Sequence, residues 1–227
     1  DTLIPSFKKQ IDDYLRSHGS KAQIRCGYGL TECTGACCLN PRKEYRDNSI
    51  GIPLPDMDFK IMRIDSNKEA NFLEDGEIWV SGPTVMKGYL NDPEETKKVL
   101  IRGIDGKVWL HTGDIGCMDE DGFVYFKQRL KRLIVSSGYN IYPSYVENII
   151  KQIPEVESCV VIGIPHPYKK QVAKAYIVLK EGIKVSTTVK KNIKRHCDII
   201  QNSPEDKIRN SELFHIKTSV DCLKRII

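Results

Sequence analysis

The sequence has no long hydrophobic run. Its uninterrupted apolar stretches are only a few residues long, far short of the roughly 20 that a membrane-spanning helix needs. The first residues, "DTLIPSFKKQIDDYLRSHG", show no secretory signal pattern and resemble the interior of a domain. We therefore expect no transmembrane segment and a cytoplasmic location.

The sequence also lacks the paired cysteine or cysteine–histidine spacings that are typical of zinc sites. Its 8 cysteines are scattered, apart from the cluster Cys33, Cys37 and Cys38. Because free cysteine is among the residues most often buried, we expect ordinary reduced thiols and no disulfide framework.

The excess of one charge sign is small, because 35 Lys and Arg residues against 30 Asp and Glu residues give a net charge of +5. The excess of Lys and Arg lies in residues 180–227, where the only aromatic residue is Phe214. A nucleic-acid-binding surface usually combines clustered basic residues with aromatic or amide side chains that contact bases. The sequence therefore predicts no nucleic-acid partner.

The first part of the chain is predicted to contain a helix followed by several strands. Apolar residues at helical spacing predict a helix over 5–18, and "AQIRC" at 22–26 is typical of a short strand. Asp92 and Pro93 can begin a second helix. Between residues 50 and 128, turn residues separate strand-like segments, which favours a small barrel or a curled sheet. These segments are "DFKIMRI", "GEIWVSG", "KVWLHTG" and "GFVYFKQ", with "DEDG" as a turn before the last.

The pattern changes after Arg129. Two short strands are predicted around Gly138, then a helix over 144–153 with Tyr145 on its apolar face. Two buried strands and a basic helix over 187–197 follow. We therefore predict an α+β multidomain chain that divides into residues 1–128 and 129–227.

Three stretches contain residues suited to binding a phosphorylated ligand. "GYGLTECTG" at 27–35 combines glycines, which let backbone approach a ligand closely, with an aromatic ring and a carboxylate that could bind a metal. "HTGD" at 111–114 and "QRLKR" at 128–132 are also polar. Taken singly, each stretch is equally typical of a turn or a solvated surface.

Their order and spacing resemble the adenylate-forming (ANL) superfamily of acyl-CoA synthetases, peptide-synthetase adenylation domains and luciferases. "YGLTE" resembles its adenine-and-phosphate motif, "GEIWVSGPTVMKGYLNDPEET" its GEI…G…GY…T stretch, and "WLHTGD" its Y-x-T-G-D motif. "QRLKRLIVSSGYNIYPSYVE" resembles the hinge segment, and similarity continues to about residue 198. The resemblance implies that residues 1–128 are the end of a large domain with a small β-barrel-like subdomain. Residues 129–227 would then be a compact α+β C-terminal lid domain.

The resemblance implies an AMP-forming acid–thiol ligase. Such enzymes activate a carboxylic acid with ATP to an acyl adenylate and transfer the acyl group to CoA, with Mg²⁺ as cofactor. Thr31 and Glu32 would be catalytic, Thr31 by binding phosphate and Glu32 by ligating Mg²⁺. The implied nucleotide-binding residues are Gly27, Tyr28, Gly29, Thr31, Asp114 and Arg129, with Tyr28 against adenine and Asp114 on the ribose hydroxyls.

The same resemblance implies that Lys131 is the hinge residue and that Gly138 lies in a loop on the CoA side. Acetate-activating relatives carry tryptophan at the position of Gly29, so glycine there implies a longer or aromatic acid.

The chain departs from the family pattern in several places. Gln128 replaces the glycine of the hinge motif. The Ser/Thr/Gly-rich phosphate loop and the terminal P-K/R-T-x-x-G-K motif are not found in the sequence. We therefore expect a C-terminal fragment of a ligase that is inactive alone. A peptide-synthetase adenylation domain and a degenerate, non-catalytic binding module are the alternatives.

Overall fold

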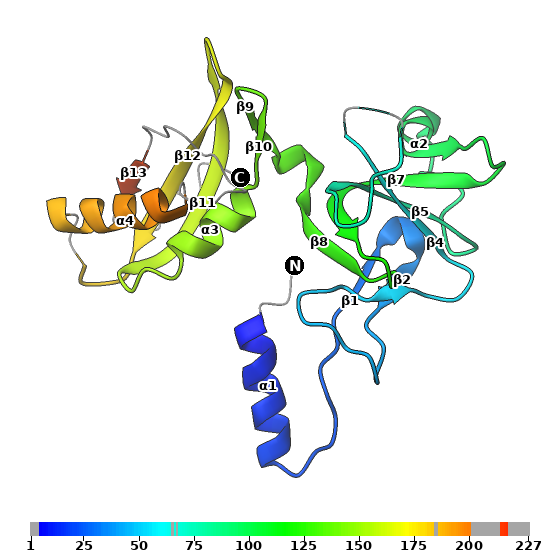
Figure 1. The fold of residues 1–227 in the computed structure, drawn as a ribbon, viewed down its shortest axis with the longest axis horizontal. Helices are drawn as coiled ribbons and strands as arrows, with labels where there is room; N and C mark the ends of the chain where they lie inside the picture. Colours follow the sequence, from blue (N-terminus) through cyan, green and yellow to red (C-terminus); the bar gives the residue numbers. More distant parts are fainter. Residues whose placement is uncertain (1–4, 65, 67, 184–185, 201–213, 218–227) are drawn as a thin grey trace. The chain divides into compact units, whose positions relative to one another are not determined.

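The computed structural model describes residues 5–64, 66, 68–183, 186–200 and 214–217. The chain divides into two compact units, Asp1–Leu130 and Lys131–Ile227 (Figure 1). None of the helices in these described ranges is long and apolar enough to cross a bilayer. The expected domain boundary after residue 128 lies next to this division, and the mobility of the second unit stays a prediction.

The first unit begins with helix α1 (Pro5–Ser17), as predicted. Its expected apolar face is only partly buried, since Phe7 and Tyr14 are 54% and 63% exposed. Asp12 is buried instead, and its Oδ1 accepts a hydrogen bond from the backbone N–H of Ile24 at 2.9 Å. The strand predicted over "AQIRC" is wrong, because this segment is irregular. The backbone N–H of Ile24 is bonded to the carboxylate of Asp12 in helix α1 and not to a neighbouring strand.

The glycine-rich stretch forms an antiparallel hairpin. Its sheet has the order β1-β2-β3, with strands β1 (Gly27–Leu30), β2 (Gly35–Leu39) and β3 (Ile52–Pro53) and the 3₁₀ helix η1 (Thr31–Cys33) between β1 and β2. The pairing shifts register between Tyr28 and Gly29. A Cβ atom on Gly29 would lie 2.0 Å from the carbonyl oxygen of Gly35, so the hairpin itself requires glycine here.

A second sheet of the first unit contains five antiparallel strands. They are β4 (Asp58–Met62), β5 (Gly76–Ser81), β6 (Leu100–Arg102), β7 (Val108–Met118) and β8 (Val124–Arg129). The four strands predicted between residues 50 and 128 are confirmed. Helix α2 (Pro93–Val99) also begins as predicted, because Oδ1 of Asp92 caps it by accepting from the N–H of Glu95 at 3.0 Å.

The barrel expected for this region is not confirmed. The order is β4-β5-β7-β6, and β8 pairs with the later half of β7, so the described strands form an open sheet. A one-residue bridge between Gly51 and Val124 joins this sheet to the first one. Both sheets contribute to one core, in which Cys33, Cys37 and Cys38 are buried as free thiols.

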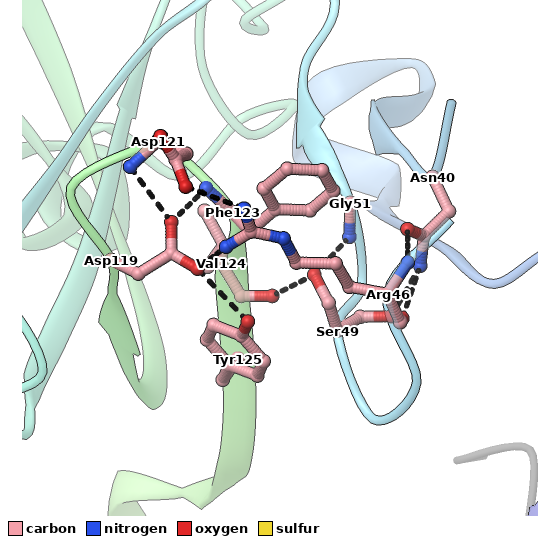
Figure 2. Close-up of polar contacts among 9 residues, drawn as sticks. All are labelled: Asn40, Arg46, Ser49, Gly51, Asp119, Asp121, Phe123, Val124 and Tyr125. Atoms are coloured by element: carbon pink, nitrogen blue, oxygen red, sulfur yellow. Dashed lines mark hydrogen bonds and ion pairs between the residues drawn. The ribbon is translucent and has the colours of Figure 1, made fainter. Parts of the chain in front are cut away.

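An arginine clamp fastens the loop between β2 and β3 to the predicted "DEDG" turn (Figure 2). The guanidinium of Arg46 donates to Oδ2 of Asp119 and Oδ2 of Asp121, both at 2.5 Å, and lies 4.1 Å from the centre of the Phe123 ring. The hydroxyl of Tyr125 also donates to Oδ2 of Asp119 at 2.9 Å. The two segments are thereby held together through charge-assisted bonds.

The second unit is a sheet covered by two helices on one face (Figure 1). Its order is β10-β9-β12-β11, and β13 pairs in parallel with β12. The strands are β9 (Ile134–Ser136), β10 (Tyr139–Ile141), β11 (Val156–His166), β12 (Lys170–Leu179) and β13 (Phe214–Lys217). The covering helices are α3 (Pro143–Ile150) and α4 (Thr187–Ile200), and the short 3₁₀ helix η2 (Leu130–Arg132) spans the division between the units. The α+β prediction is confirmed.

One face of this sheet supplies the core. Ala175, Ile177 and Leu179 alternate along β12, as residues on one face of a strand must, and all three are buried. Helix α3 contributes Val146 and Ile150. Tyr145 was expected on the same face but is 45% exposed, so that detail of the prediction is wrong.

Candidate functional site

A bulge in β7 carries the carboxylate that the sequence predicts to bind ribose. Between the cross-strand pairs Trp79–His111 and Glu77–Ile115, three residues of β7 (112–114) stand opposite a single residue of β5. Such bulges re-aim side chains locally. The "TGD" motif is this bulge.

Each residue of the bulge has a distinct structural role. The hydroxyl of Thr112 donates to the carbonyl oxygen of Ile78 at 2.6 Å and accepts from the N–H of Asp114 at 3.1 Å. Gly113 has a φ of +68°, a left-handed conformation that favours glycine. Its N–H donates to Oε1 of Glu77 at 2.9 Å. Backbone groups that the bulge removes from the strand ladder are therefore bonded by side chains.

Three predicted nucleotide-binding residues meet at the bulge. Asp114 is only 3% exposed, and its Oδ2 accepts a hydrogen bond from the hydroxyl of Tyr28 at 2.7 Å. Arg129 is the cross-strand partner of Asp114, and its Nε lies 3.1 Å from Oδ1. The geometry of that ion pair is not that of a hydrogen bond, so Oδ1 is buried and receives no hydrogen bond from the residues that the structure describes.

Burial has the largest effect on the pKa values of Asp114 and Tyr28. It raises the pKa of Asp114, while the Tyr28 hydrogen bond and the positive charge of Arg129 act in the opposite direction. Burial, followed by the negative charge of Asp114, raises the pKa of Tyr28 far above its usual value. Tyr28 is therefore a permanent donor to Oδ2, and Oδ1 is suited to accept a hydroxyl from a ligand.

The ring of Tyr28 is half-buried and has aromatic neighbours within the protein. Its centre lies 6.5 Å from that of Phe59 in an edge-on arrangement and 6.4 Å from that of Phe126. These contacts fix the ring from the side of the core. Its packing against adenine stays a prediction.

Thr31 and Glu32 lie in η1, directly after the strand that carries Tyr28. Thr31 is exposed, whereas Glu32 is half-buried and its Oε1 accepts from the hydroxyl of Tyr89 at 2.7 Å. No hydrogen bond reaches Oε2 from the part of the chain that the structure describes.

A magnesium ion suits this carboxylate. In the described ranges no three His, Cys, Asp or Glu side chains converge to form a protein cage for a metal ion. Mg²⁺ is usually bound by one or two carboxylates together with waters and substrate phosphates, so a single Glu32 oxygen fits that mode.

Lys131 and Gly138 belong to the second unit and are described within it. Lys131 is exposed in η2. Gly138 has a φ of +84° and follows Ser137 at +51°, which is the backbone of a two-residue hairpin turn between β9 and β10. The hairpin is confirmed, while the hinge and CoA-side roles of these residues stay predictions.

Sequence reasoning missed Glu77, Thr112 and Tyr89 as site residues. All three lie inside stretches that resemble motifs of the family, and this position in a motif is the signal that could have identified them. Their bonds to the bulge and to Glu32 link residues that are distant in the chain, and a single sequence does not reveal such pairs.

Two family models match the chain. One described as AMP-binding enzyme matches residues 5–90, and one described as AMP-binding enzyme C-terminal domain matches residues 145–212. A long-chain-fatty-acid–CoA ligase of Bacillus subtilis (strain 168) is 43% identical over 162 residues, which are 71% of this chain and 28% of that ligase.

Solved structures give a consistent result. ATP-bound MatB from Rhodopseudomonas palustris matches with a TM-score of 0.73 and 28% identity, over 92% of this chain and 40% of that one. O-succinylbenzoate coenzyme A synthetase (MenE) from Bacillus subtilis in complex with AMP matches with a TM-score of 0.71 and 29% identity, over the same shares of 92% and 40%. The chain thus spans well under half the length of each of these proteins.

Proposed function

The chain belongs to the AMP-binding enzyme family, and from that premise we propose that it supplies nucleotide-binding residues of an ATP-dependent carboxylic acid–CoA ligase. The reaction converts acid, ATP and CoA into acyl-CoA, AMP and pyrophosphate through an acyl adenylate. Identity of 43% to a long-chain-fatty-acid–CoA ligase supports a fatty acid as the substrate.

The observation that carries this proposal is the buried carboxylate of Asp114. Its Oδ2 is held by Tyr28, and its Oδ1 is buried with no hydrogen-bond donor in the described part of the chain. A buried acceptor without a donor is costly unless a ligand satisfies it. In our proposal Oδ1 accepts a ribose hydroxyl, and the guanidinium of Arg129, on a side chain that is 66% exposed, turns to a ribose or phosphate oxygen.

The hairpin turn would contact the phosphates. Gly27 and Gly29 keep β1 free of side chains beside Tyr28, and the exposed hydroxyl of Thr31 can donate to a phosphate oxygen. Glu32 would bind Mg²⁺ through Oε2. When bound, that ion neutralises negative charge on the phosphates.

The second unit would complete the reaction cycle. We propose that it rotates about Lys131 between acid activation and thioester formation, as a hinge of a few residues permits. The exposed hairpin at Gly138 would then approach CoA.

Catalysis by these 227 residues alone is not expected. The sequence contains neither the Ser/Thr/Gly-rich phosphate loop nor the terminal lysine motif of the family. Removing one donor to a transition-state charge costs on the order of 10²–10³ in rate. We therefore expect nucleotide binding with no release of pyrophosphate above background, whichever acid is supplied.

Calorimetric titration of the chain with AMP tests the proposal. We expect weak binding, with a Kd on the order of 1 mM, and at least about tenfold weaker binding of 2′,3′-dideoxy-AMP, which lacks the hydroxyls for Asp114. Equal affinity for the two nucleotides, or no heat with 10 mM AMP (about ten times the expected Kd), contradicts the proposal.

A further inference from the structure

The stretch over residues 76–96 contains a "GY" pair for which the proposed function has no role. Tyr89 is 38% exposed, and its hydroxyl donates to Oε1 of Glu32 at 2.7 Å, across 57 positions of sequence. The hydroxyl bond to Glu32 gives this tyrosine a structural role.

The backbone of Tyr89 is fixed by the start of helix α2. Its N–H donates to Oγ1 of Thr96 at 2.9 Å, and that hydroxyl donates to the carbonyl oxygen of Asp92 at 2.8 Å. Gly88 has a φ of +152°, and a Cβ atom there would lie 2.9 Å from Cγ2 of Thr96. The segment "GYLNDPEET" thus fixes the backbone position of Tyr89.

Residues 84–86, just before this segment, form two further hydrogen bonds with η1 and the residue after it. The N–H of Met86 donates to the carbonyl oxygen of Glu32 at 2.7 Å. The hydroxyl of Thr34 donates to the carbonyl oxygen of Thr84 at 2.9 Å. Both the backbone and the side chain of Glu32 are therefore held by residues 84–89.

We propose that Tyr89 is a positioning residue for the metal-binding carboxylate, holding Oε1 of Glu32 so that Oε2 points to Mg²⁺ on the nucleotide phosphates. This inference rests on the proposed function. Hydrogen-bond partners of metal-ligating carboxylates orient the ligand, and their loss typically weakens metal binding 10–100-fold.

The test measures binding of Mn²⁺–ATP to the whole chain by water-proton relaxation, with Mn²⁺ as a paramagnetic probe in place of Mg²⁺. Tyr89→Phe removes one hydroxyl at an exposed site, and we expect it to weaken Mn²⁺–ATP binding about 10-fold or more while metal-free AMP binding stays unchanged. Tyr125→Phe is the matched control, because it removes a tyrosine–carboxylate bond of the same kind from the arginine clamp (Figure 2). It should leave both affinities unchanged.

A double-mutant cycle shows whether Tyr89 acts through Glu32. In the Glu32→Gln background, Tyr89→Phe should cause little further loss, because the two residues share one interaction. Equal Mn²⁺–ATP affinity of Tyr89→Phe and the unsubstituted chain overturns the inference, as does an equal loss for metal-free AMP. If the unsubstituted chain binds neither AMP nor Mn²⁺–ATP, the proposed function itself fails.

Discussion

The hydroxyl of Tyr28 donates to Oδ2 of Asp114 at 2.7 Å and joins residues that are 86 positions apart. The first residue lies in the glycine-rich hairpin and the second in the bulge of β7. This bond connects the two motifs on which the nucleotide-binding proposal depends. Its donor is fixed by burial, and its acceptor retains one oxygen for a ligand.

Asp114→Asn should separate binding from stability. Burial raises the pKa of Asp114 in the folded chain above the unfolded value of about 3.9. Between those two pKa values the folded chain holds more protons than the unfolded chain, so stability falls as pH rises through that interval. A neutral Asn avoids this cost, so at pH 7 the Tm should be unchanged or higher.

The affinity of the Asp114→Asn variant for AMP should nevertheless fall at least about tenfold, because the charged acceptor for the ribose hydroxyls is lost. Thermal unfolding and calorimetric titration of the same samples measure both quantities. Unchanged affinity for AMP, or a much lower Tm at neutral pH, would contradict our assignment of Asp114.

Tyr28→Phe should destabilise the first unit, because it leaves a buried carboxylate without its donor. We expect the free energy of unfolding to fall by about 1.5–3 kcal/mol, as measured by urea denaturation. Tyr125→Phe is the control: Asp119 keeps its bonds to Arg46 and to the N–H of Phe123, so the loss should be smaller. Equal losses would show that the Tyr28 bond is not special.

Gly29→Ala tests whether the hairpin or the acyl substrate requires glycine. The new Cβ atom would lie 2.0 Å from a backbone oxygen, so we expect a clear fall in Tm and faster amide exchange in β1 and β2. Gly27→Ala is the matched control in the same strand, where the nearest contacts are 3.1 Å, and its effect should be milder. A normal Tm for Gly29→Ala would show that the hairpin tolerates a side chain at this position. It would then favour the proposed role of Gly29 in accommodating a longer or aromatic acid.

Glu77→Ala should weaken AMP binding, although we do not expect Glu77 itself to contact the nucleotide. Glu77 accepts from the N–H of Gly113 and from the indole N–H of Trp79, both at 2.9 Å, so its loss releases the bulge that aims Asp114. Glu74→Ala is the control, since Glu74 accepts from Arg63 and Asn71 away from the bulge. We expect both variants to lose stability and only Glu77→Ala to lose affinity, measured by the same titration.

The sequence predicted most of the strands and helices because their signals are local. Alternation, Asp92 as a cap and turn glycines each depend on a few neighbouring residues. What the local signals missed depends on distant partners. "AQIRC" is irregular because Asp12 binds Ile24, and the hairpin form of the glycine-rich stretch, which the sequence did not predict, depends on pairing with β2. The barrel depended on a closure that the described strands do not make.

The candidate site followed the same rule. Tyr28, Asp114 and Arg129 could be proposed from the sequence because each lies in a motif of a recognisable family. Glu77 and Tyr89 could not, because what links them to the candidate site is a bond to a residue 36 or 57 positions away. The reason for each motif residue became apparent only from its partner in space.

The central claim is that Tyr28, Glu32, Asp114 and Arg129 form one nucleotide site, and backbone ¹⁵N NMR of the chain during AMP titration tests it most directly. We predict that the amide shifts that change are those of β1, η1, the 112–114 bulge and the end of β8. Shift changes confined to other segments, or none at 10 mM AMP (about ten times the expected Kd), would contradict it.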